Sequence, residues 1–96
     1  MKVSNMTSSK GNKIANQFIV YDTNGNKYFQ SYKAVIAEID PANNIRLDEK
    51  YWNYSNTTGK YRNIFLEENI NETKKKIKSG EYKLVNLNEG NKNGYY

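Results

Sequence analysis

The sequence predicts an α+β domain in which an antiparallel sheet carries two short helices on one face. The first half of the chain alternates apolar and polar residues over short runs separated by turn residues, which is typical of strands. After Asp48 the apolar spacing changes to three and four residues, which is typical of helices. A final alternating run follows. A sheet with helices on one side satisfies both patterns, in the order β-β-β-β-α-α-β.

The first half of the chain is expected to form an antiparallel meander. Its four strands are residues 17–21, 27–32, 34–39 and 45–47. The pair Asn24-Gly25 predicts a two-residue type I′ turn after the first strand, because both central residues of that turn need positive φ. Pro41 presets φ for a second turn, over residues 40–44.

The second half is expected to form two helices and a last strand. The run from Ser55 to Thr58 supplies N-cap candidates for the first helix. Tyr61, Ile64 and Phe65 would form its buried face, and the helix would end near Glu68.

The second helix has stronger end signals. Asn69 and Glu72 have the spacing of a capping box, and Gly80 suits the position after a helix that ends at Ser79. Residues 81–87 then alternate as a fifth strand, at an edge of the sheet or inside it.

The polar ends are expected to lie outside this domain. Residues 1–13 show no periodicity and are predicted to be a flexible arm, residues 14–87 a single domain, and residues 88–96 a flexible tail. No apolar run could span a membrane or serve as a signal peptide, so the expected location is the cytoplasm of a bacterial host cell.

The composition argues against an enzyme. The chain contains no cysteine and no histidine, which excludes thiol chemistry, thiolate metal sites and histidine-based acid–base catalysis. The adjacent carboxylates Asp48/Glu49 and Glu67/Glu68 would point in different directions in a strand or a helix. We therefore expect no catalytic residues, no metal and no cofactor.

The net charge of +5 favours an anionic partner, although it is equally compatible with solubility alone. Only two of the basic residues, Arg46 and Arg62, are arginines. Because readers of specific base sequences depend heavily on bidentate arginine, sequence-specific DNA recognition is disfavoured.

Several short motifs resemble those of one small protein family. They are Phe29-Gln30-Ser31-Tyr32, Val35-Ile36-Ala37, W-N-Y-S-x-T-T-x-K-Y at residues 52–61, Phe65-Leu66 and I-K-S-G-x-Y at residues 77–82. The sequence resembles, over residues 16–87, an uncharacterised domain of phages, prophages and low-GC bacteria. That family has aspartate where this chain has Asn53. The resemblance implies a mobile-element origin and supplies no activity or site.

Three groups of residues are candidates for binding. The first is an aromatic and hydroxyl-rich segment at the expected helix start, where N–H groups favour anions and aromatic rings can stack on bases. It comprises Trp52, Tyr54, Thr58, Lys60 and Tyr61. The same residues could instead cap the helix, fill the core and face solvent.

The second group is Lys74, Lys75 and Lys78 on the second helix, which suits a phosphate backbone or an ordinary solvated face. The third is a strip on one strand face, formed by Tyr28, Gln30 and Tyr32. If Phe29 points into the core, this strip lies on the open face of the sheet; otherwise the helices cover it.

These features predict a small non-enzymatic binding module from a phage or mobile element, with nucleic acid or an acidic protein surface as its partner. The alternative is an inhibitor of a host defence system, similar to anti-CRISPR proteins, that acts by protein–protein contact. The oligomeric state is not predicted.

Overall fold

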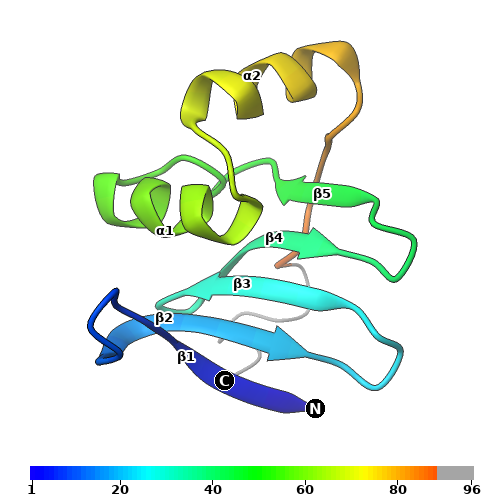
Figure 1. The fold of residues 1–96 in the computed structure, drawn as a ribbon. Helices are drawn as coiled ribbons and strands as arrows, with labels where there is room; N and C mark the ends of the chain where they lie inside the picture. Colours follow the sequence, from blue (N-terminus) through cyan, green and yellow to red (C-terminus); the bar gives the residue numbers. More distant parts are fainter. Residues whose placement is uncertain (89–96) are drawn as a thin grey trace.

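A six-stranded sheet forms the body of the computed structural model, which describes residues 1–88 (Figure 1). The strands lie in sequence order. They are β1 (Lys2–Thr7), β2 (Lys13–Tyr21), β3 (Lys27–Ser31), β4 (Ala34–Ile39), β5 (Ile45–Asp48) and β6 (Lys83–Val85). The helices α1 (Asn56–Leu66) and α2 (Ile70–Ser79) connect β5 to β6. The α+β class is therefore confirmed.

The sheet is mixed rather than wholly antiparallel as expected. The first four strand pairs are antiparallel, but β5 and β6 pair in parallel at the edge. A parallel pair needs a crossover connection, and here α1 and α2 provide it.

The flexible arm predicted at residues 1–13 instead contains a strand, so that prediction is wrong for residues 2–7. β1 pairs with β2 from Lys2 opposite Tyr21 to Thr7 opposite Lys13. Met6 is buried with the residues beneath the helices, whereas Val3 packs on the opposite face. Each face of β1 thus carries one buried or half-buried apolar side chain. Two such residues are too few to produce a recognisable alternation of apolar and polar residues in the sequence.

Both hairpin turns at one end of the sheet have the same structure. Asp22 and Asp40 each accept bonds from the backbone N–H groups two and four residues later, and from the side-chain amides of Asn26 and Asn44 respectively. These bonds hold the pKa of both aspartates below its usual range. The predicted type I′ turn is wrong, because Gly25 has positive φ but Asn24 does not.

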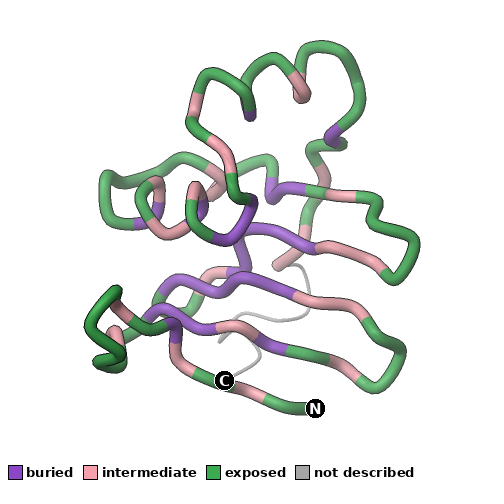
Figure 2. Tube along the Cα trace, viewed as in Figure 1, coloured by how far each residue is buried: buried purple, intermediate pink, exposed green. Residues whose placement is uncertain are grey.

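Apolar side chains are buried on both faces of the sheet, and Figure 2 shows that the buried residues are concentrated in the central strands β3 and β4. On the helix side, Phe29 and Leu47 pack with Phe65 and Leu66 of α1. On the opposite side, a second cluster comprises Phe18, Val20, Tyr28 and Val35, with Val3 and Leu87 packed against it.

α1 begins as expected, and its buried face is correct for Phe65 and for the half-buried Tyr61 but wrong for Ile64. The Ser55 side chain accepts a bond from the Thr58 N–H and caps the helix. The buried residues are Thr58, Arg62, Phe65 and Leu66. Ile64, which was expected to face the core, is 53% exposed.

Arg62 is almost completely buried although it has no carboxylate within hydrogen-bonding distance among the described residues. Its Nη1 donates to the Trp52 carbonyl at 2.8 Å and to Asn53 Oδ1 at 2.9 Å, and Nη2 donates to Asn63 Oδ1 at 3.0 Å. Burial lowers the pKa of Arg62. The arginine therefore ties the β5–α1 loop to the helix.

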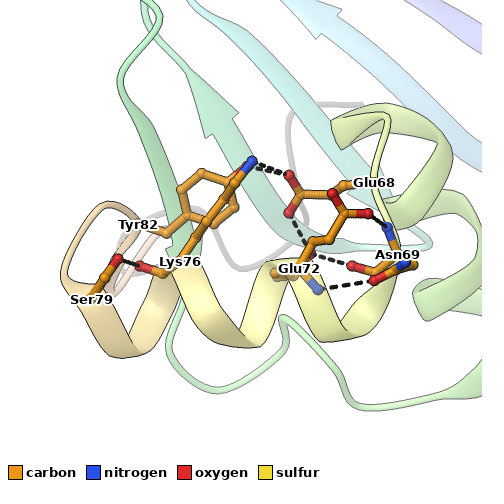
Figure 3. Close-up of polar contacts among 7 residues, drawn as sticks. Glu68, Asn69, Glu72, Lys76, Ser79 and Tyr82 are labelled. Atoms are coloured by element: carbon orange, nitrogen blue, oxygen red, sulfur yellow. Dashed lines mark hydrogen bonds and ion pairs between the residues drawn. The ribbon is translucent and has the colours of Figure 1, made fainter.

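α2 has the predicted capping box, in which Asn69 and Glu72 exchange bonds, and it ends at Gly80 with φ of 84°. Figure 3 shows this helix beside Glu68, whose carboxylate accepts bonds from Thr73 at 2.5 Å, Lys76 at 2.8 Å and Tyr82 at 2.7 Å. These bonds join α2 to the segment that leads into β6.

The pKa values in this cluster reflect the same contacts. Burial acts to raise the pKa of Glu68, but the bonds from Lys76, Thr73 and Tyr82 outweigh it and lower the pKa. Burial, together with the bond to Glu68, raises the pKa of Tyr82 to about 12. The hydrogen bond to Glu68 raises the pKa of Lys76.

The last strand is shorter than the predicted range 81–87. After β6 the chain remains attached to the sheet, because Asp48 accepts a bond from the Leu87 N–H and the Asn88 side chain bonds to Val35. Asn88 is thus held in place, and the rest of the tail predicted at residues 88–96 lies outside the described residues.

Candidate functional site: a tyrosine-lined pocket

A pocket of about 440 Å³ lies where the β3–β4 turn, the β5–α1 loop and residue 88 meet. It is lined by Lys33, Ala34, Tyr51, Tyr54 and Asn88. In Figure 1 the β3–β4 turn and the start of α1 lie at the same end of the sheet, away from the two aspartate-based turns. Three segments that are distant in sequence therefore form one concave surface.

Asp48 positions two walls of this pocket. It is almost fully buried, and its Oδ2 accepts bonds from the N–H groups of Lys50 at 3.0 Å and Tyr51 at 2.8 Å. Its Oδ1 accepts the bond from the Leu87 N–H at 2.9 Å. One carboxylate thus fixes the start of the β5–α1 loop and the segment that carries Asn88.

Asn88 is a fixed part of the wall. Its Oδ1 accepts a bond from the Val35 N–H at 2.8 Å, and its Nδ2 donates to the Val35 carbonyl at 2.9 Å. The side-chain amide therefore pairs with β4 as the backbone of a neighbouring strand would.

The aromatic lining forms a corner. The ring centres of Tyr51 and Tyr54 are 5.5 Å apart, and the angle between the two ring planes is 78°. Tyr54 is 46% exposed. The ammonium group of Lys50 lies 5.4 Å from the centre of the Tyr51 ring. A planar ring that entered the pocket could stack on one tyrosine and meet the other at its edge.

The β3–β4 turn carries Tyr32 and Lys33. Tyr32 has φ of 57°, which ends β3, and its N–H donates to the Asn16 carbonyl at 2.7 Å. A smaller pocket of about 160 Å³ lies beside the turn and is lined by Asn16, Phe18, Tyr32 and Lys33. Lys33 therefore lines both pockets.

The structure separates the first group of predicted binding residues. Only Tyr54 lines a pocket. Trp52 and Tyr61 are half-buried against the core, and Lys60 is exposed, with its ammonium group 5.4 Å from the centre of the Tyr61 ring. Thr58 is wrong as a contact residue because it is fully buried and its hydroxyl bonds to Ser31 at 3.0 Å.

The predicted strip on β3 is not an open surface. Phe29 does point toward the helices, but Tyr28 and Gln30 are buried on the other face. The Tyr28 hydroxyl bonds to Asp22 and the Gln30 amide bonds to the Tyr32 carbonyl. Of this strip only Tyr32, 49% exposed, is available at the surface.

The predicted lysines on α2 form a separate surface. Lys74, Lys75 and Lys78 are exposed, whereas Lys76 bonds to Glu68. None of the three exposed lysines lines either pocket. In Figure 1, α2 lies beyond β5.

Sequence reasoning missed Lys33, Tyr51 and Asn88 as site residues. Lys33 follows the F-Q-S-Y motif directly, and Tyr51 precedes the W-N-Y-S motif. Their positions beside these motifs are a signal that could have identified them, whereas nothing local marks Asn88.

The described residues hold no group of three or more histidine, cysteine, aspartate or glutamate side chains that could bind a metal ion. No helix within residues 1–88 is long and apolar enough to cross a membrane.

Comparison with known families gives one match. The model of DUF8033, a family of unknown function, matches residues 1–83. The chain belongs to this family. The DUF8033 match includes β1, and it ends in β6 before Asn88. No curated protein and no solved structure matches the chain.

Proposed function

We propose that this DUF8033 protein is a non-enzymatic binding module for single-stranded nucleic acid and that the tyrosine pocket is its contact surface. The observation that carries the proposal is the combination of Tyr51, Tyr54 and Lys33 in one pocket. Aromatic side chains stack on bases of any sequence, and lysine attracts the phosphate backbone.

The charge of the whole chain supports an anionic ligand. The formal charge is +5, and lysines 33 and 50 lie at the pocket. The pocket is lined by no arginine among the described residues, which fits binding without selection of a base sequence.

Glu68 has a structural role. Its side chain is only 3% exposed. Glu68 receives bonds from three side chains, and it lines neither pocket. We therefore assign Glu68 no part in the proposed binding.

The test is fluorescence anisotropy of a labelled oligothymidylate, titrated with the wild-type protein and two variants at low salt. Tyr54→Ala removes an exposed pocket tyrosine. Tyr21→Ala is the matched control, because Tyr21 is 41% exposed at the end of β2 and lines neither pocket. Loss of one stacking contact costs about 1–3 kcal/mol, so Tyr54→Ala should weaken binding about tenfold and Tyr21→Ala should not change it.

A variant with Lys74, Lys75 and Lys78 all changed to glutamine distinguishes the pocket from α2. If this variant loses binding while Tyr54→Ala keeps it, the contact surface is α2 and the pocket proposal is wrong. If wild-type protein binds no single strand at low salt, the nucleic-acid proposal fails and a host protein becomes the partner to seek.

A further inference from the structure

The two pockets described above share one lysine in their walls. Lys33 lines both the larger pocket, with Tyr51 and Tyr54, and the smaller one, with Phe18 and Tyr32. Each pocket therefore has two aromatic side chains in its wall, of which Phe18 is largely buried, and the two pockets share one cationic side chain.

This alternation corresponds to the covalent pattern of a single-stranded nucleic acid. Successive bases are flat rings that can stack on aromatic side chains, and one negatively charged phosphate joins each pair of nucleosides. A ligand with two rings joined by an anion could place one ring in each pocket and its anion at the lysine that both pockets share.

Hydrogen bonds hold the walls of both pockets in place. The Tyr32 N–H bonds to the Asn16 carbonyl at 2.7 Å, and Asp48 holds the Tyr51 N–H at 2.8 Å. Because these segments are already ordered, binding would cost little conformational entropy on the protein side.

We propose that the two pockets take two consecutive bases of a single strand, one base in each pocket, with the phosphate between them on the Lys33 ammonium group. This inference rests on the proposed function and goes beyond it, because it assigns the number of bases bound and the side chain that contacts the phosphate between them.

The test compares two labelled oligonucleotides that have the same length, the same charge and the same number of thymines. In the first strand, two adjacent thymines alternate with two adjacent abasic positions. In the second strand, single thymines alternate with single abasic positions. The inference predicts roughly tenfold tighter binding of the paired strand, because only that strand can fill both pockets at once.

An unmodified oligothymidylate of that length separates the possible failures. If it binds and the two abasic strands bind equally, the inference is wrong and the proposed function stands. If it does not bind, both are wrong.

Lys33→Gln supplies a second measurement. This exposed turn residue is not part of the core, so the variant should fold. In Lys33→Gln, the slope of log affinity against log salt concentration should decrease in magnitude by about one unit. In the control Lys2→Gln, which alters an exposed lysine on β1, the slope should be unchanged. An unchanged slope for Lys33→Gln would overturn the assignment of the phosphate.

Discussion

Replacing Glu68 by glutamine tests the polar cluster that joins α2 to the last strand. The Glu68 side chain is only 3% exposed, and its carboxylate accepts bonds from Thr73, Lys76 and Tyr82. Glutamine has nearly the same shape but removes the charge. The substitution therefore weakens the three bonds without leaving a cavity.

The expected loss of stability is about 2 kcal/mol. A hydrogen bond to a charged group contributes about 1.5–3 kcal/mol and a neutral one about 0.5–1.5 kcal/mol, so the bonds from Thr73 and Tyr82 each lose about 1 kcal/mol. The Lys76 contact is partly exposed to solvent and screened, so we assign it no share. For a chain of this size, this corresponds to a decrease in melting temperature of roughly 10 °C.

The assay is urea unfolding followed by the fluorescence of Trp52, the single tryptophan. Glu67→Gln is the matched control, because Glu67 is the adjacent residue and is exposed; it should change stability by less than about 0.5 kcal/mol. If both variants unfold at the same urea concentration, the cluster does not stabilise the fold as reasoned here.

The same pair of proteins gives a pH dependence. Because the pKa of Glu68 is lowered in the folded state from 4.5, its contribution is present above that value and is lost as pH falls through the folded pKa. The difference in stability between wild type and Glu68→Gln should therefore decrease in acid. A difference that stays constant below pH 4.5 would contradict the shift.

Three further predictions concern hydrogen bonds in which at least one side chain is buried. Tyr82→Phe should be less stable than wild type near neutral pH, and urea midpoints of the two should converge between pH 10 and about 12, because the folded pKa of Tyr82 is raised. Asn53→Asp should raise the free energy of unfolding by about 1 kcal/mol, because a charged oxygen would then accept the bond from Arg62 that the amide oxygen accepts now; a lower urea midpoint would contradict this. Thr58→Val should lower the free energy of unfolding by about 1–3 kcal/mol, because the buried hydroxyl of Ser31 loses its partner; an unchanged urea midpoint would show that the pair contributes nothing.

Features encoded by nearby residues could be predicted from the sequence. The capping box of Asn69 and Glu72, the Gly80 stop and the Ser55 cap all depend on residues within one turn of the helix. The bounds of β4 were also correct, because that strand is almost wholly buried and every residue in it except Glu38 is apolar.

Features that depend on distant residues could not be predicted. β1 forms because β2 offers an edge in register, although its own sequence has almost no apolar pattern. The buried face of α1 was predicted only in part, because a charged Arg62 normally indicates solvent, whereas here loop oxygens from Trp52 and Asn53 accept its hydrogen bonds. Ile64 is left at the surface as a result.

The candidate site was predicted only in part for the same reason. Tyr54 and Tyr32 were identified from their residue type, and both are exposed at the pockets. Asn88 bonds to Val35, 53 residues earlier in the chain, and no local pattern reveals such a contact.

The most direct test of the proposed site is a titration of ¹⁵N-labelled protein with oligothymidylate, followed by amide chemical shifts. The account predicts that the first amides to shift are those of Lys33, Ala34, Tyr51 and Tyr54, whose residues line the larger pocket. Shifts confined to α2, or no shifts at all at low salt, would contradict it.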